Sequence, residues 1–177
     1  MLTLRPYEPA DADIILSWIK SREDAIRWSV DRYDRYPIRP EDMNHKYIDC
    51  HGDCPGPEWF FPVTAIDGDK VAGHLILRYP EADKRTVRLG FVIVDRDCRR
   101  KGYGKAMLKL ALDYAFRELK AEKVTLGVLA NNPDAYHCYK SVGFEDVTPD
   151  APEYYDFLGE QVACLELEMA RGQWHEA

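Results

Sequence analysis

The residues best suited to chemistry form a short basic stretch that contains two glycines. The stretch consists of Arg99, Arg100, Lys101, Gly102, Tyr103, Gly104 and Lys105. An apolar run precedes it and a helical pattern follows, so it is expected at the N-terminus of a helix. The N–H groups of a first helical turn have no intrahelical acceptor and carry the positive end of the helix dipole. Positions without side chains let a phosphate approach these groups closely. The stretch therefore predicts an anion site, and a diphosphate suits it.

Two common phosphate-binding patterns do not fit this stretch, and a third does. A Walker loop requires Ser or Thr after its lysine, but Ala106 follows Lys105, and the first glycine of the loop is missing. A dinucleotide fingerprint requires a third glycine where this chain has Met107. The third pattern, Q/R-x-x-G-x-G/A, is matched in full by residues 99–104.

A second pattern follows further along the chain and reads Asn132-x-x-Ala135-x-x-x-Tyr139-x-x-x-Gly143-Phe144. The two patterns, with the strand–motif–helix order expected around each, resemble the GCN5-related N-acetyltransferase (GNAT) superfamily. Members of that superfamily bind acetyl-coenzyme A with the first pattern. The resemblance is strong over residues 86–144 and looser over residues 2–20 and 58–79.

The resemblance implies that three segments bind acetyl-coenzyme A, the expected co-substrate, and it implies no metal. The backbone of Val92, Ile93 and Val94 would pair with the pantetheine arm as an added strand does, and an N–H group there would face the thioester oxygen. Residues 99–105 would hold the pyrophosphate. Asn132 would contact the cofactor arm, although capping of the next helix is an alternative explanation for it.

The resemblance also gives Tyr139 a catalytic role, in which its hydroxyl protonates the thiolate that leaves the thioester. Protonation helps because the pKa of a free thiol is about 8.5. Packing on an amphipathic helix is the alternative explanation for this tyrosine. Histone-acetylating relatives carry a glutamate base on the central strand, where this chain has Arg88, which argues against a histone lysine as acceptor. The remaining candidates for a base are Glu58, His74, Glu81 and Asp95.

Composition excludes several other classes of protein. The chain has 177 residues, with 24 basic and 31 acidic residues, which gives a net charge of −7. A general nucleic-acid binder is normally basic, so nucleic acid is not an expected partner. We find no apolar run of about 20 residues and no signal-peptide pattern, so we expect a cytoplasmic protein without a membrane partner. The group of Cys50, His51 and Cys54 resembles a metal or redox loop, but no second pair of ligands accompanies it.

Periodicity predicts a single domain over residues 1–177 with a mixed α/β sheet. Its expected parts are strands at residues 1–5, 58–66, 70–79, 86–95, 123–130, 144–147 and 162–170, and helices near residues 9–20, 39–50, 101–120 and 132–142. Residues 28–40 are expected to form a surface loop. In the GNAT fold that the resemblance implies, a mostly antiparallel sheet contains one splayed parallel strand pair and is flanked by helices.

The leading interpretation is an N-acetyltransferase that moves an acetyl group from acetyl-coenzyme A to a primary amine of a small molecule or a protein N-terminus. The alternative is a non-catalytic module that binds acetyl-coenzyme A or coenzyme A and regulates a partner. A homodimer is possible. By resemblance, residues 24–50 and 150–161 would shape the acceptor site, and their aromatic and acidic side chains suggest a cationic amine.

Overall fold

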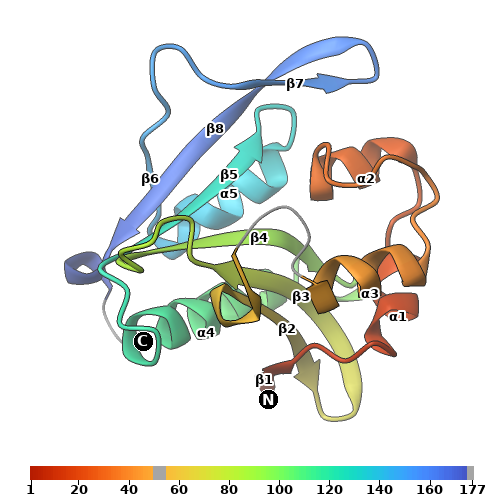
Figure 1. Cartoon of the computed structure of the whole chain (residues 1–177), viewed down its shortest axis with the longest axis horizontal. Helices are drawn as coiled ribbons and strands as arrows, with labels where there is room; N and C mark the ends of the chain where they lie inside the picture. The colour runs from red at the N-terminus through yellow and green to blue at the C-terminus, as the bar shows by residue number, and fades with distance from the viewer. Residues whose placement is uncertain (50–54, 175–177) are drawn as a thin grey trace.

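A computed structural model of the protein describes residues 1–49 and 55–174. Five α-helices and eight strands are defined in this part of the chain (Figure 1). In chain order they are β1 (Leu2–Pro6), α1 (Asp11–Ser17), α2 (Arg22–Ser29), α3 (Pro40–Asp49), β2 (Phe60–Asp67), β3 (Lys70–Arg78), β4 (Thr86–Val94), α4 (Tyr103–Arg117), β5 (Lys123–Leu129), α5 (Pro133–Val142), β6 (Glu145–Asp146), β7 (Tyr154–Phe157) and β8 (Glu160–Ala170).

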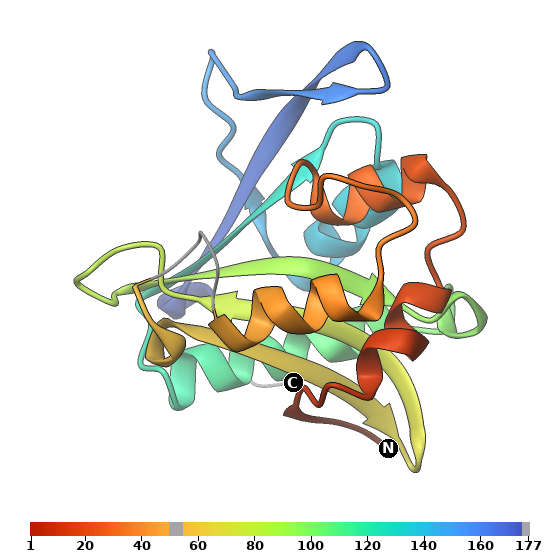
Figure 2. The same cartoon turned by 45° about the vertical axis from the view of Figure 1, so that its right-hand side comes forward.

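The strands form one mixed sheet in the order β1-β2-β3-β4-β5-β8-β6, and β7 pairs with β8. All neighbours are antiparallel except β4 and β5. That parallel pair is joined only at its beginning, where Thr86, Val87 and Arg88 pair with Lys123, Val124 and Thr125. Beyond Arg88 the two strands diverge, as Figures 1 and 2 both show. The predicted mixed sheet with a splayed parallel pair is confirmed.

Helices cover both faces of the sheet (Figure 2). On one face, α4 buries a stripe that includes Met107, Leu108, Ala111 and Leu112 against side chains of β3, β4 and β5. On the other face, α1, α2 and α3 enclose a second apolar cluster. A surface helix stays in place because it buries such an apolar face. The sheet therefore carries one core on each side.

A bulge in β4 divides this strand between the two cores. Ile76 pairs with Gly90 while His74 pairs with Ile93, so β4 has one residue more than β3 in this interval. Before the bulge, Val87 and Leu89 face the α4 side; after it, Phe91 and Ile93 face the other side. One extra residue reverses the alternation of side chains, because that alternation has a period of two. Phe91 takes up the irregularity with a φ of +48°.

The prediction for one segment and those for two side chains were wrong. The expected loop at residues 28–40 begins within α2, and β7, which was not among the expected strands, lies within residues 150–161. Helical periodicity predicts that Tyr114 lies on the buried stripe of α4 and Ile14 on that of α1, but these side chains are 37% and 43% exposed. Each of these two residues lies just outside the apolar arc that its helix turns toward the sheet.

Candidate active site

A cavity of about 840 Å³ lies where β4 ends and α4 begins. One wall is formed by the end of β4 and the turn that follows it, and the opposite wall by α5. Trp18 and Ile19, which follow α1, close a third side with apolar surface. The predicted cofactor residues that line this cavity are Val92, Ile93, Val94, Arg99, Arg100, Gly102, Gly104, Lys105 and Asn132. Lys101 and Tyr103 belong to the same turn but are not among the lining residues.

The turn into α4 has the geometry of an anion site. Gly102 occupies the N-cap with a φ of +85°, a conformation that favours glycine, and no side chain caps the helix. The first helical bond runs from the N–H of Ala106 to the carbonyl of Gly102. The N–H groups of Tyr103, Gly104 and Lys105 come before that bond and so have no acceptor within the helix. Gly104 and Lys105 line the cavity. Tyr103 points elsewhere, because its hydroxyl donates to Asp67 at 2.6 Å.

The edge of β4 that faces β5 is open along the same cavity. Ile93 and Val94 pair with β3 on their other side, whereas the pairing with β5 stops at Arg88. Backbone groups on this edge are therefore free of a strand partner within the described residues. An extended amide-containing chain can pair with such an edge as an added strand does.

A second cavity, of about 140 Å³, adjoins the first on the side of β7 and β8. Its walls come from α2, β3, β4 and β5, with Tyr155 and Cys164 from the β7–β8 hairpin. The two cavities share six lining residues, which are Arg27, Trp28, Val92, Asn132, Ala135 and Tyr139. A molecule in each cavity would therefore meet the other between β4 and α5, next to Tyr139.

Tyr139 is buried on α5 and is 6% exposed. Burial raises the pKa of its hydroxyl well above the ordinary value, and the neighbouring Cys138 adds to this rise. The residue therefore remains a neutral phenol at physiological pH and retains a proton to donate. Its ring packs edge-on against Phe144, with 6.2 Å between the centroids. The packing interpretation and the catalytic one are thus compatible for this side chain.

Asn132 has the capping role that was considered for it. Its side-chain oxygen accepts a hydrogen bond from the N–H of Ala135 at 3.4 Å, at the start of α5. The same residue lines both cavities. Contact with a cofactor arm stays a prediction.

Trp28 contributes to the site in a way that the sequence did not predict. Its indole N–H donates to the carbonyl of Phe91 at 2.8 Å, in a buried position, and so holds the bulge of β4. The ring stacks on Tyr33 with an interplanar angle of 8°. Gly90 is the only sequence signal for this arrangement, since a glycine inside a strand often marks a bulge.

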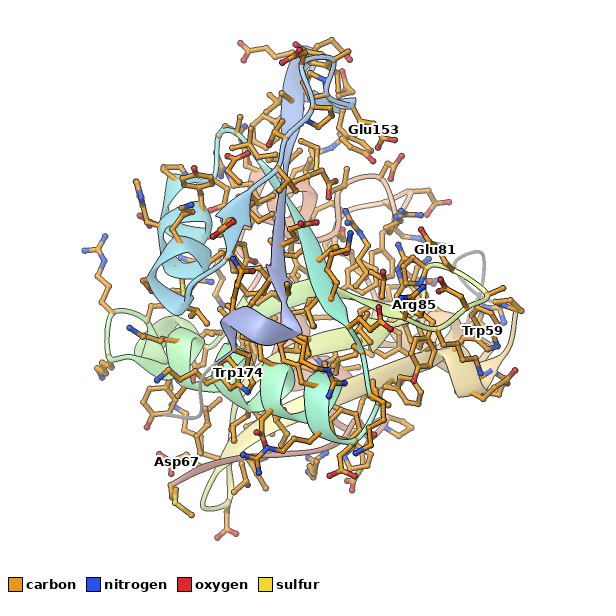
Figure 3. All side chains as sticks on the ribbon, turned by 90° about the vertical axis from the view of Figure 1, so that its left-hand side faces the viewer. Trp59, Asp67, Glu81, Arg85, Glu153 and Trp174 are labelled. Atoms are coloured by element: carbon orange, nitrogen blue, oxygen red, sulfur yellow. The ribbon has the colours of Figure 1, made fainter. Side chains whose placement is uncertain are left out.

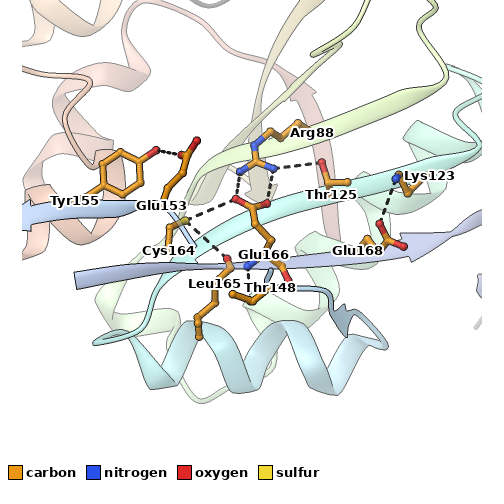
Figure 4. Close-up of polar contacts among 10 residues, drawn as sticks. All are labelled: Arg88, Lys123, Thr125, Thr148, Glu153, Tyr155, Cys164, Leu165, Glu166 and Glu168. Atoms are coloured by element: carbon orange, nitrogen blue, oxygen red, sulfur yellow. Dashed lines mark hydrogen bonds and ion pairs between the residues drawn. The ribbon is translucent and has the colours of Figure 1, made fainter. Parts of the chain in front are cut away.

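Arg88 forms an ion pair across β5 (Figure 4). Its guanidinium makes two bonds to Glu166, of 2.8 and 2.9 Å. Burial tends to lower the pKa of Arg88, but the bonds from Glu166 raise it overall. Gly127 lies between the partners, and a Cβ there would stand 2.8 Å from Nη2 of Arg88 and 2.9 Å from Sγ of Cys164. The pair can bridge β4 and β8 only because this position has no side chain.

None of the four residues considered as a base lines either cavity. His74 is fully buried and lies against Tyr47, with 2.6 Å between Nε2 and the hydroxyl oxygen. Asp95 pairs with Lys70 at 2.7 Å. Glu81 lies on the side of the molecule that carries Arg85 and Trp59 (Figure 3), and Glu58 is the neighbour of Trp59 in sequence.

Metal and membrane features were searched in residues 1–49 and 55–174. No three His, Cys, Asp or Glu side chains of this part are grouped so that they would hold a metal ion. None of its helices combines the length and the apolar character that a membrane crossing requires. Cys50, His51 and Cys54, the loop considered for a metal or a redox pair, lie outside the described residues.

Comparison with known protein families gives one match over most of the chain. A family model described as "Acetyltransferase (GNAT) family" matches residues 22–144. An L-amino acid N-acetyltransferase of Escherichia coli is 28% identical over 107 residues, which cover 60% of this chain and 64% of that protein. A UPF0039 protein of Schizosaccharomyces pombe is 36% identical over 89 residues, or 44% of this chain and 57% of that protein. These two matches span less than two thirds of the relatives' length.

Polyamine-acetylating proteins also resemble this chain. A probable spermine N(1)-acetyltransferase of Bacillus subtilis subsp. natto is 28% identical over 123 residues, which cover 67% of this chain and 78% of that protein. The crystal structure of spermidine N-acetyltransferase from Vibrio cholerae, in complex with CoA and spermine, matches with a TM-score of 0.79 and 20% identity. That match covers 97% of this chain and 96% of the other. At this identity it shows a shared fold.

Proposed function

Because the chain belongs to the acetyltransferase (GNAT) family, we propose that it is an acetyl-coenzyme A-dependent N-acetyltransferase acting on a primary amine. One observation carries the proposal: the cavity of about 840 Å³ and the cavity of about 140 Å³ meet beside Tyr139. We call them the long cavity and the short cavity. The long cavity suits a coenzyme with an anionic end and an amide-containing arm. The short cavity suits the amine. Direct transfer needs both substrates bound at once, and this arrangement provides a place for each.

In this proposal the pyrophosphate of the coenzyme binds the amides at the start of α4, with Arg99, Arg100 and Lys105 around it. Helix N-termini attract anions through these amides and the helix dipole. Lys101 and Tyr103, which do not line the cavity, contribute through the backbone of the turn alone. The pantetheine arm pairs with Val92, Ile93 and Val94 along the open edge of β4.

Transfer then proceeds by attack of the neutral amine on the thioester carbonyl. A backbone N–H of residues 92–94 donates to the oxygen as it becomes negative. The carbon–sulfur bond breaks, and Tyr139 gives its proton to the sulfur. Since burial makes Tyr139 a weaker acid than a thiol, it acts as a relay: as its proton leaves, the proton lost by the attacking nitrogen replaces it, directly or through water.

Purified protein incubated with acetyl-coenzyme A and a panel of amines tests the proposal. Free thiol should appear with at least one amine, and calorimetry should show binding of coenzyme A. Tyr139→Phe should lower kcat about 100-fold, in the range that a general acid contributes, and should leave the affinity for coenzyme A within about twofold. Coenzyme binding without thiol release would favour the regulatory module instead. Absence of coenzyme binding would refute both functions.

The assembly state and the location are also proposed here. We keep a homodimer and a cytoplasmic location as predictions. Light scattering on the eluting peak of a gel-filtration column would measure the mass of the assembly. Fractionation of cells that produce the tagged chain would locate it. A monomer, or a tagged chain in the membrane or secreted fraction, would contradict these predictions.

A further inference from the structure

The charged side chains that line the short cavity are all arginines. Four of its lining residues are arginines, contributed by α2, by the loop after α2, by β3 and by β4: Arg27, Arg32, Arg78 and Arg88. Among the described residues, no Asp or Glu lines this cavity. The chain as a whole has a net charge of −7, so the surplus of arginines is a local property of the cavity.

The other titratable side chains in the walls add no negative charge. Burial raises the pKa of Tyr155 to about 12 and that of Cys164 to about 11. Both groups, like Tyr139, are therefore protonated and neutral near pH 7. Three carboxylates lie near the walls and each has a partner there. Glu166 accepts two bonds from Arg88, Glu153 accepts the hydroxyl of Tyr155 at 2.8 Å, and Asp31 lies 3.8 Å from Arg32.

Arg27 lies where it can bind the acceptor close to the point at which the acetyl group would be transferred. It lies in the last turn of α2, next to Trp28, and lines both cavities at the point where they meet. Its guanidinium carbon is 4.9 Å from the centre of the Phe157 ring. Contact with a ring face holds the guanidinium plane, while its N–H groups at the rim can still donate to an anion.

Arginines in the walls act in opposite ways on an amine and on an anionic group that belong to the same acceptor. They disfavour a protonated amine, so they lower its pKa and increase the neutral, nucleophilic fraction. An ordinary alkyl amine with a pKa near 10.4 has only about one molecule in a thousand neutral at pH 7, and none of the residues lining this cavity is a carboxylate or an imidazole that could take the proton. The same walls attract a carboxylate or a phosphate.

We propose that the acceptor is a small primary amine that also carries an anionic group, a carboxylate or a phosphate, bound in the arginine-lined short cavity with Arg27 as its closest anchor to the reacting amine. The proposal rests on the acetyl transfer proposed above. It does not require Arg32, Arg78 or Arg88 to be free of partners. Arg88 pairs with Glu166 and Arg32 lies 3.8 Å from Asp31, so the anchoring role is assigned to Arg27. The cavity volume of about 140 Å³ is close to that of an engineered cavity of about 150 Å³ that accepts benzene.

The proposal predicts poor use of polyamines. A polyamine brings several positive charges and no anion, so the arginines would oppose its entry. This separates the expected acceptor from those named for the spermine- and spermidine-acetylating relatives. The aromatic residues expected in the acceptor site are partly present, since Trp28 and Tyr155 line the cavity, but the acidic residues expected beside them do not line it.

Matched acceptors give a direct test. Rates of thiol release would be compared for leucine against leucinamide, for phosphoethanolamine against ethanolamine, and for spermidine. We expect kcat/KM to be at least tenfold higher for the anionic member of at least one pair, and lowest for spermidine. The pair that shows the difference tells a carboxylate from a phosphate. KM of the preferred acceptor should also rise with added salt, because salt screens charges.

Variants on α2 locate the effect. In Arg27→Gln, the ratio of kcat/KM for the anionic member of the pair to kcat/KM for the uncharged member should fall close to one, mainly through KM. Arg27→Lys should restore part of this ratio. Arg22→Gln is the matched control, because it removes the same charge from the same helix at an exposed position outside both cavities. Its preference should equal that of the unchanged protein.

The outcomes separate the two proposals. Thiol release with leucinamide, ethanolamine or spermidine at rates equal to the anionic amines would overturn the acceptor proposal and leave acetyl transfer standing. An equal loss for both members of each pair in Arg27→Gln would remove Arg27 as the anchor. Coenzyme binding without thiol release from any amine would overturn acetyl transfer and the acceptor proposal with it.

Discussion

The indole nitrogen of Trp28 lies 2.8 Å from the carbonyl oxygen of Phe91 and donates a buried hydrogen bond to it. This bond joins α2, which borders the short cavity, to the bulge of β4, which borders both cavities. The bulge turns the strand so that the residues after it face different cores from those before it. A single side chain thus links the acceptor side of the site to the proposed cofactor strand.

Trp28→Phe should therefore affect stability and coenzyme binding together. The substitution leaves the carbonyl of Phe91 buried without its donor, which costs about 1–3 kcal/mol. Urea unfolding measures this loss, and calorimetry with coenzyme A should show weaker binding. Trp174→Phe is the matched control, because the buried indole N–H of Trp174 has no acceptor within the described chain. A free energy of unfolding reduced equally in both variants would contradict the role of the bond.

The two glycines before α4 should respond differently to alanine. Gly102 has a φ of +85°, so Gly102→Ala should cost about 1–2 kcal/mol of stability through backbone strain. Gly104 lies in the helix, and a Cβ there would meet Sγ of Cys138 at 3.4 Å and Cγ2 of Val94 at 3.7 Å, which are ordinary contacts. Gly104→Ala should leave the free energy of unfolding unchanged or slightly raised, and should weaken coenzyme A binding about tenfold by filling the cavity. Unaltered binding in Gly104→Ala would contradict the close approach of a phosphate.

Stability should depend on pH through His74. Burial lowers its pKa to about 3 in the folded chain, whereas an unfolded histidine titrates near 6.5. Below pH 6.5 the unfolded chain binds a proton that the folded chain does not, so stability is lost as the pH falls, approaching about 1.4 kcal/mol per pH unit. Urea unfolding between pH 7 and pH 5 should show this slope, and His74→Gln should reduce it.

Tyr47→Phe tests the cause of this slope. It removes the hydroxyl next to Nε2 of His74 but leaves the histidine buried. The slope should persist in Tyr47→Phe, since burial is the main cause of the lowered pKa. A flat profile in this variant would assign the effect to the hydrogen bond.

Removal of the charge at Glu166 should destabilise the protein more than the same change at Glu168. Glu166→Gln weakens the two bonds to the partly buried Arg88, at a cost of about 1–3 kcal/mol. Glu168 lies on the same strand and pairs with Lys123 at 3.2 Å at a more open position, where such a pair contributes less than about 1 kcal/mol. A double-mutant cycle with Arg88→Gln should show coupling for Glu166. Additive losses in that cycle would contradict the ion pair.

Much of the fold was predictable because it follows from local patterns. Alternating and apolar runs identified β1 to β5 and β8, and the two motifs placed the starts of α4 and α5. The start of α2 also had a signal, because Ser21 accepts the N–H of Asp24 as an N-cap, but the aromatic residues that follow made the segment resemble a loop. The strand β7 was missed because only its pairing with β8 makes Tyr154–Phe157 extended.

The site was predicted where it depends on backbone and missed where it depends on long-range contacts. Glycines at fixed spacing identify the start of α4 from sequence alone. In contrast, the bond from Trp28 joins residues 63 positions apart, and the pair of Arg88 with Glu166 joins residues 78 positions apart. The charge of the short cavity likewise arises from four separate elements. No local pattern reports such combinations, because packing brings them together.

The missing side chain at Gly127 limits how this protein can vary. A Cβ at this position would be within 3 Å of both Arg88 and Cys164, so even alanine would push the guanidinium away from its carboxylate. Arg88 and Glu166 connect strands on either side of β5, at the point where the pairing of β4 with β5 stops. A residue larger than glycine at position 127 is therefore compatible with the fold only in a protein that lacks the ion pair between residues 88 and 166.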